Sequence, residues 1–215
     1  MFVTANPDLG FIHIPRTGGT SVTRSLENSD CNITQVCRTH ALYKEFSNHM
    51  PAQWFATIRH PAARLHSGYY YQIEQDKNRL AGNLPMKSGL TKDFLHNRID
   101  MFCTYGFEKT ILSPEFCKDY NYLKQKYNIK SLNVLEQMQS ICEYINGCKN
   151  IILFDIDTQS TELFDWIKNF IPSAAYVCVN NKNQAATWKE EMSDKLRDYI
   201  NNKYKDDLKR FEYTL

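Results

Sequence analysis

The stretch LGFIHIPRTGGTS, residues 9–21, decides the fold of this chain. Its apolar half, residues 9–14, stops at Pro15 and a pair of glycines, after which the pattern becomes helical. A strand that passes through a glycine loop into a helix is the opening unit of an α/β domain. The same order returns downstream, where residues 53–58 run toward Pro61, and proline is favoured in the first turn of a helix.

The other elements follow from hydrophobic periodicity and turn residues. Strands are expected at residues 9–14, 33–37, 53–58 and 150–156, with a short edge strand at 176–179. Helices are expected at 20–27, 41–49, 61–74, 91–98, 114–127, 131–146, 161–170 and 187–211, the last with a break near Tyr204. The run NIILFDI is almost wholly apolar, which is typical of a strand buried on both faces of a parallel sheet.

This pattern predicts an α/β protein with a three-layer, P-loop-like fold, in which helices flank a central, mainly parallel sheet. Residues 1–215 are expected to form a single domain, in keeping with the usual domain size. The periodicity loosens after residue 76, and we interpret residues 76–127 as an insertion on the acceptor side of the site.

Composition excludes several classes of protein. The chain is 42% hydrophobic and 23% charged, as in ordinary globular proteins, and its net charge of +2 gives no global attraction for nucleic acid or acidic membrane. It contains neither a signal peptide nor an apolar stretch long enough for a membrane anchor, so a cytoplasmic protein is expected. Its seven cysteines are predicted to be mostly reduced, although a Cys142–Cys148 or Cys103–Cys117 bridge stays open.

The glycine loop has the chemistry of an anion site. Between strand and helix it offers a cation, two glycines that allow close backbone approach, and hydroxyl side chains near a helix N-terminus. The candidate ligands for a phosphate are Pro15, Arg16, Thr17, Gly18, Gly19, Thr20 and Ser21. Gly19 is followed by threonine, so the lysine of the Walker pattern of ATP and GTP kinases is absent.

A second cationic string begins where the strand at 53–58 ends. RHPAARLHSGY, residues 59–69, places Arg59 at the end of the strand and puts Arg64 and Ser67 three residues apart on one face of a helix. We expect these three side chains to converge on a second anion. The alternative is a solvated basic helix.

Together the two strings resemble the motifs of sulfotransferases that use 3′-phosphoadenylyl sulfate (PAPS), especially the carbohydrate O-sulfotransferases and their soluble bacterial and viral relatives. HIPRTGGTS resembles their 5′-phosphosulfate loop, and R-x-P-x-x-R-x-x-S-x-Y, matched from Arg59 to Tyr69, resembles their 3′-phosphate motif. The end of the chain, residues 179–213, is also similar to the family, whereas residues 76–127 match no motif.

The resemblance implies that the protein transfers a sulfuryl group from PAPS to an acceptor hydroxyl, with a carbohydrate as the expected acceptor and no metal ion. Arg16 then stabilises the leaving oxygen, because sulfuryl transfer resembles phosphoryl transfer in needing in-line geometry and charge stabilisation. The predicted base is His40, because histidine titrates near neutral pH and this one follows the strand at 33–37, at the sheet edge where α/β folds bind ligands. His40 also matches the catalytic histidine of the carbohydrate 2-O-sulfotransferases.

The sequence departs from the family at two positions. Arg16 stands where the family commonly has lysine, and Arg38 stands where the 2-O-sulfotransferases have a further histidine. Two alternatives to the sulfotransferase are a P-loop kinase for a small molecule, and a nucleotide-binding relative that has lost catalysis. The sequence leaves the acceptor and the oligomeric state open.

Overall fold

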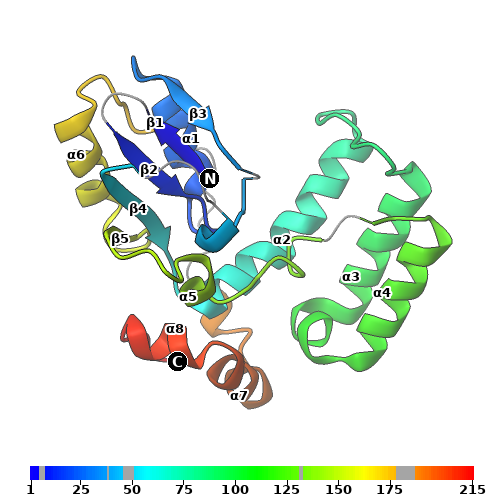
Figure 1. Cartoon of the computed structure of the whole chain (residues 1–215). Helices are drawn as coiled ribbons and strands as arrows, with labels where there is room; N and C mark the ends of the chain where they lie inside the picture. Colours follow the sequence, from blue (N-terminus) through cyan, green and yellow to red (C-terminus); the bar gives the residue numbers. More distant parts are fainter. Residues whose placement is uncertain (5–7, 38, 46–50, 131–132, 178–186) are drawn as a thin grey trace.

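A mixed β-sheet organises the structure, which we describe from a computed structural model (Figure 1). The structure describes residues 1–4, 8–37, 39–45, 51–130, 133–177 and 187–215. Within these ranges the strand order is β3-β1-β2-β4-β5. The strands are β1 (Phe2–Thr4), β2 (Leu9–Ile12), β3 (Ile33–Gln35), β4 (Gln53–Ile58) and β5 (Ile151–Asp155).

The central strands are parallel, as predicted. β2 pairs with β4 and β4 pairs with β5 in parallel, with Phe11 opposite Phe55 and Phe55 opposite Ile152. The short strand β1, which the sequence analysis missed, is antiparallel to both β2 and β3. Since β2, β4 and β5 point the same way, the segments that follow them meet at one edge of the sheet.

Alternation along the strands gives the sheet two apolar faces. Phe11 and Phe55 point to the face covered by α1 (Gly19–Glu27) and α6 (Ser160–Phe170). Ile12 and Trp54 point to the opposite face, which α5 (Ile141–Tyr144) and the end of the chain cover. The three-layer arrangement that the sequence predicted is therefore present.

A helical region packs beside the sheet, and in Figure 1 α2 runs out from the sheet toward α3 and α4. Its apolar core is formed by α2 (Pro61–Leu80), α3 (Lys92–Leu112), α4 (Pro114–Lys126) and α7 (Asp194–Lys203). The helices that the sequence predicted at 61–74 and 91–98 are both longer in the structure. α2 continues to Leu80 and α3 is 21 residues long, with a break at Gly106, where φ is 71°.

Other predicted helices are shorter or divided. The helix expected at 131–146 is reduced to α5, and residues 134–137 form turns. From the helix expected at 41–49 the structure keeps a single 3₁₀ turn, η1 (Tyr43–Glu45), and residues 46–49 lie outside the described residues. The terminal helix is divided at Tyr204, as expected, into α7 and α8 (Lys205–Arg210), and η2 (Thr187–Lys189) precedes them.

Three smaller expectations also have outcomes. Tyr176 and Val177 are not in a strand, and the rest of the edge strand predicted at 176–179 lies outside the described residues. The six cysteines within the described residues are unpaired, so neither bridge that the sequence left open is formed. Within the described residues, none of the helices has the length and apolarity needed to span a bilayer.

A buried ion pair joins α2 to α3. The carboxylate of Asp76, which is fully buried, accepts two hydrogen bonds from Arg98, at 2.7 Å from Nε and 2.6 Å from Nη2. Gln72 donates to the same carboxylate and accepts from the backbone N–H of Val134. The polar residues that make this stretch resemble a loop in the sequence are therefore internal partners.

Substitution of Arg98 by methionine tests the role of this pair. Removal of one partner leaves the buried Asp76 without its bidentate cation, and such changes cost about 3–5 kcal/mol. We expect the free energy of unfolding, measured by urea denaturation, to fall by about that amount. Arg24→Met, which breaks the exposed Arg24–Glu27 pair, is the matched control and should have little effect. Equal losses in the two variants would contradict this account.

Candidate functional site

The glycine loop connects β2 to α1 at the carboxyl edge of the parallel strands. Arg16 has a positive φ of 63°, unusual for a residue with a side chain, and Gly18 has a φ of 80°. Gly18 precedes α1 without a side chain to cap it, and no acidic residue occupies the first turn of this helix. The first N–H groups of a helix have no partner inside it, so this end of α1 presents donors and a positive dipole.

The two glycines are required by close packing. A Cβ atom at Gly18 would lie 2.6 Å from Cγ1 of Ile156, and one at Gly19 would overlap the ring of His13. Any larger residue would therefore push the loop away from the sheet. The sequence analysis explained the glycines by approach to an anion, and the structure adds this packing requirement.

Arg16 and Ser67 come from the two different strings and are in direct contact. Nε and Nη2 of Arg16 donate to Oγ of Ser67 at 3.1 and 2.7 Å. The Arg16 guanidinium also lies 4.0 Å from the centre of the Tyr71 ring, a cation–π contact. Burial, together with the nearby charge of Arg59, lowers the pKa of Arg16 to about 10, so Arg16 stays charged at neutral pH.

Arg59 follows β4 at the same edge of the sheet. Its Nε donates to Oδ2 of Asp157, a residue that follows β5, at 2.8 Å. The Arg59 side chain is 15% exposed. Its charge acts on Arg16 and lowers the pKa of that residue. Like charges repel, and an anion bound by both guanidinium groups would relieve that repulsion.

Two predicted ligands have other uses. Arg64 is 1% exposed and its guanidinium is bonded entirely within the protein, with Nε donating to the carbonyl of Pro15 at 3.2 Å. The hydroxyl of Thr17 is also buried, where it donates to the carbonyl of Ile14 and contacts the hydroxyl of Thr57. Arg64 and the Thr17 side chain therefore hold the loop in place, whereas Thr20 is exposed at the first turn of α1.

His40 lies close to the loop, as predicted. Its Nδ1 is 3.1 Å from Oε1 of Gln137, and its ring meets that of His13 edge to face at 5.0 Å between centres. An amide oxygen only accepts, so Nδ1 carries the proton and Nε2 is the basic nitrogen. Burial, and then the charges of the Met1 ammonium and of Arg16 and Arg64, lower the pKa of His40. It is therefore neutral at pH 7.

His13 fills the space between the sheet and α1. It is buried, but among the described residues its Nδ1 has no hydrogen-bond partner, in contrast to the bonded core histidine that is usual in proteins. Burial, and then the proximity of His40, lowers the pKa of His13 to about 3, which keeps it neutral. Its ring packs against Gly19 and so supports the glycine loop from the side of the sheet.

Three residues of the site escaped sequence analysis. Asp157 had a usable signal, because it follows β5 at the edge where Arg59 follows β4. Tyr71 belongs to a run of three tyrosines, residues 69–71, in which the sequence does not distinguish the buried Tyr69 from the other two. Gln137 had no signal, since it belongs to a segment predicted as helix and contacts His40 across 97 residues of sequence.

The arrangement suits the transfer of a group from an anionic donor. It combines a cation in the glycine loop that is bonded to a serine hydroxyl, a second cation paired with Asp157, and a neutral histidine whose Nε2 can accept a proton. Among the described residues, no group of three or more His, Cys, Asp or Glu side chains is placed to hold a metal ion.

Comparison with known proteins agrees with this chemistry. The sequence matches the profile of the Sulfotransferase family over residues 1–214, a range that includes both cationic strings and the helical region. No curated protein and no solved structure matches the chain. Because the match covers nearly every residue and the fold is α/β with parallel central strands, we conclude that the chain belongs to the sulfotransferase family.

Proposed function

We propose that this protein transfers the sulfuryl group of PAPS to a hydroxyl group of a carbohydrate. The observation that carries the proposal is the placement of Arg16. Arg16 lies in the glycine loop, and its guanidinium donates a hydrogen bond to Ser67 of the second string. The charge of Arg59 also acts on it and lowers its pKa. A donor with phosphate groups at both the 5′ and the 3′ positions fits two cationic centres at one sheet edge.

In this proposal each string binds one phosphate group of the donor. The backbone N–H groups at the start of α1, together with Arg16, Thr20 and Ser21, bind the 5′-phosphosulfate. Arg59 and Ser67 bind the 3′-phosphate, the group that distinguishes PAPS from ATP. Pro15, Thr17, Gly18 and Gly19 shape the loop, and Arg64 supports it from inside the protein.

The transfer step forms one bond to sulfur and breaks another. The acceptor oxygen attacks the sulfur in line with the bond to the 5′-phosphate oxygen, and that bond breaks with its electron pair going to adenosine 3′,5′-bisphosphate. Arg16 stabilises the charge that grows on the leaving oxygen. The hydroxyl proton passes to Nε2 of His40, which is neutral and therefore able to accept it.

The carbohydrate acceptor rests on the resemblance of His40 and its surroundings to the 2-O-sulfotransferases. Residues 76–127, which form the end of α2 and all of α3 and α4, are assigned to the acceptor side because they match no donor motif. A P-loop kinase is the alternative enzyme, and the threonine after Gly19 disfavours it.

Arg59→Ala tests the assignment of the 3′-phosphate. Loss of a charge-assisted hydrogen bond costs about 1.5–3 kcal/mol, so the Kd for adenosine 3′,5′-bisphosphate in calorimetric titration should rise about 10- to 100-fold. Arg24→Ala, which removes an exposed arginine from α1, is the control and should bind like the unchanged protein. Unchanged binding in Arg59→Ala would remove this residue from the donor site.

His40→Ala tests the base. General-base catalysis contributes about 10²- to 10⁴-fold, so kcat should fall at least about 100-fold, while calorimetry should show unchanged affinity for the bisphosphate. Turnover is measured as bisphosphate released from PAPS with a panel of carbohydrates as acceptors. His96→Gln changes an exposed histidine of α3 and should retain activity. Full turnover in His40→Ala would show that another group is the base.

The pH dependence of the unchanged enzyme gives an independent check. The active form of His40 is unprotonated, and burial lowers its pKa below the ordinary value of 6.5. As the pH falls, activity should therefore be lost with a midpoint below pH 6.5. A fall in kcat centred above pH 6.5 would contradict the assignment.

A further inference from the structure

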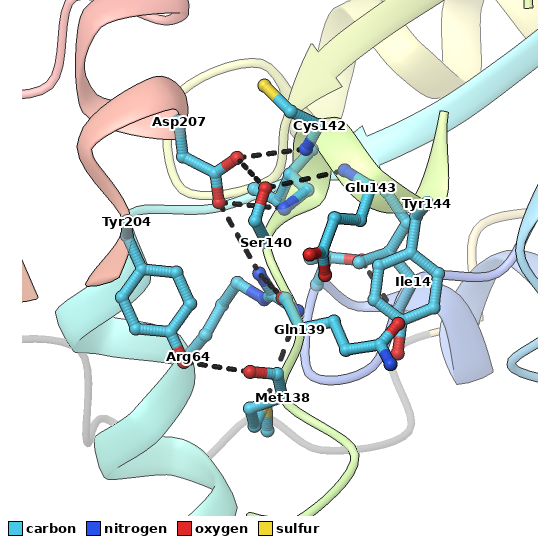
Figure 2. A network of polar contacts seen from close by, with 12 residues as sticks. Ile14, Arg64, Met138, Gln139, Ser140, Cys142, Glu143, Tyr144, Tyr204 and Asp207 are labelled. Carbon is cyan, nitrogen blue, oxygen red and sulfur yellow. Dashed lines mark hydrogen bonds and ion pairs between the residues drawn. The ribbon is translucent and has the colours of Figure 1, made fainter. Parts of the chain in front are cut away.

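Residues 137–139 form an irregular segment that is held at three successive carbonyl groups. The donors come from three different elements: Tyr144 to residue 137 at 2.7 Å, Tyr204 to residue 138 at 2.8 Å, and Arg64 to residue 139 at 3.2 Å. Figure 2 shows the contacts of Tyr204 with Met138 and of Arg64 with Gln139. These three hydrogen bonds fix the position of a segment whose backbone is not helical.

The side chain of Gln137 explains why position matters here. Its Oε1 accepts from Nδ1 of His40, so the segment determines which ring nitrogen of His40 is protonated. The charged groups that act on His40 are the Met1 ammonium, Arg16 and Arg64, and His13 contacts its ring. Gln137 is the side chain that gives the ring a directed hydrogen bond.

Arg64 joins this segment to the glycine loop. One guanidinium bonds through Nη1 to the carbonyl of Gln139 and through Nε to the carbonyl of Pro15, the residue before Arg16. Asp207, fully buried in α8, lies 4.0 Å from Nη1 of Arg64. Its carboxylate also accepts from Ser140 and from the backbone N–H groups of residues 141 and 142, so it caps α5 (Figure 2).

We infer that Gln137 and Arg64 are positioning residues: Gln137 holds His40 with its proton on Nδ1 and its Nε2 free, and Arg64 fixes the Gln137 segment and the Arg16 loop relative to each other. The inference rests on the proposed function only in naming His40 as the base and Arg16 as the group at the donor. In this inference Arg64, the second arginine of the R-x-P-x-x-R string, acts only through hydrogen bonds inside the protein. Its guanidinium is buried and does not contact a ligand.

The test of Gln137 reads the protonation of His40 directly, by two-bond ¹H–¹⁵N correlation spectra of histidine-labelled protein, with His40→Gln used for assignment. In the unchanged protein His40 should be the Nδ1–H tautomer, and in Gln137→Ala this single tautomer should be lost. Gln137→Glu places a carboxylate on Nδ1 and should raise the pKa of His40 by about one unit or more. Gln139→Glu adds the same charge on an exposed side chain two residues away and should raise it far less.

The test of Arg64 uses the same spectra and a charge-conserving change. Lysine cannot place donors on both the Pro15 and the Gln139 carbonyls, so Arg64→Lys should disturb the His40 signal and weaken bisphosphate binding by about tenfold together. Arg79→Lys is the same change on a mostly buried arginine of α2 and should alter neither. Joint loss of signal and affinity supports coupling of the two halves of the site.

Each outcome separates the inference from the proposed function. Equal pKa shifts of His40 in Gln137→Glu and Gln139→Glu would overturn the role of Gln137, whatever the turnover. An Arg64→Lys protein that is less stable but matches Arg79→Lys in both readouts would reduce Arg64 to a structural residue. If the spectra agree with the inference while the unchanged protein fails to bind the bisphosphate, the positioning contacts stand and the sulfotransfer proposal fails.

Discussion

The buried guanidinium of Arg64 is the constraint on which the arrangement of the site depends. A charge removed from water must find its partners inside the protein, and Arg64 takes them from three segments that are far apart in sequence. These are the loop after β2, the segment before α5, and α8 near the end of the chain. The Arg64 guanidinium therefore connects the sheet, the helical region and the C-terminal helices, and it does so next to the glycine loop.

The three arginines of the two strings differ in surroundings and so in use. Arg16 is held by Ser67 and Tyr71 at the mouth of the loop, where it keeps its charge despite a lowered pKa. Arg59 is paired with Asp157 and partly exposed. Arg64 has no exposed donor to offer. Residues that look alike in a linear motif thus divide into two that can meet an anion and one that supports them.

The local parts of this arrangement could be predicted from sequence. Apolar runs that end in Pro15 or before Pro61 predict strand, loop and helix, because proline and glycine act on the nearest turns of the chain. His40 could be placed near the loop because both follow strands of one sheet. These inferences needed only periodicity and the direction of parallel strands.

The rest depends on contacts between distant residues, which periodicity does not record. The polar residues Asp76 and Arg98 form a buried ion pair that holds two long helices, α2 and α3, against each other. Residues 134–139 were predicted as helix, yet side chains from α2, from α5 and from the turn between α7 and α8 satisfy the carbonyls of residues 137–139 instead. Strand β1 has three residues, too few for a pattern to be recognised. Burial of polar partners was the information missing in the first two cases, and length was the limit in the third.

The measurement that tests the central claim most directly is the affinity of the unchanged protein for adenosine 3′,5′-bisphosphate compared with that for ATP and magnesium, both by calorimetric titration. Two cationic centres at one sheet edge predict micromolar binding of the bisphosphate and much weaker binding of ATP. Tighter binding of magnesium ATP, or no binding of the bisphosphate, would contradict the account.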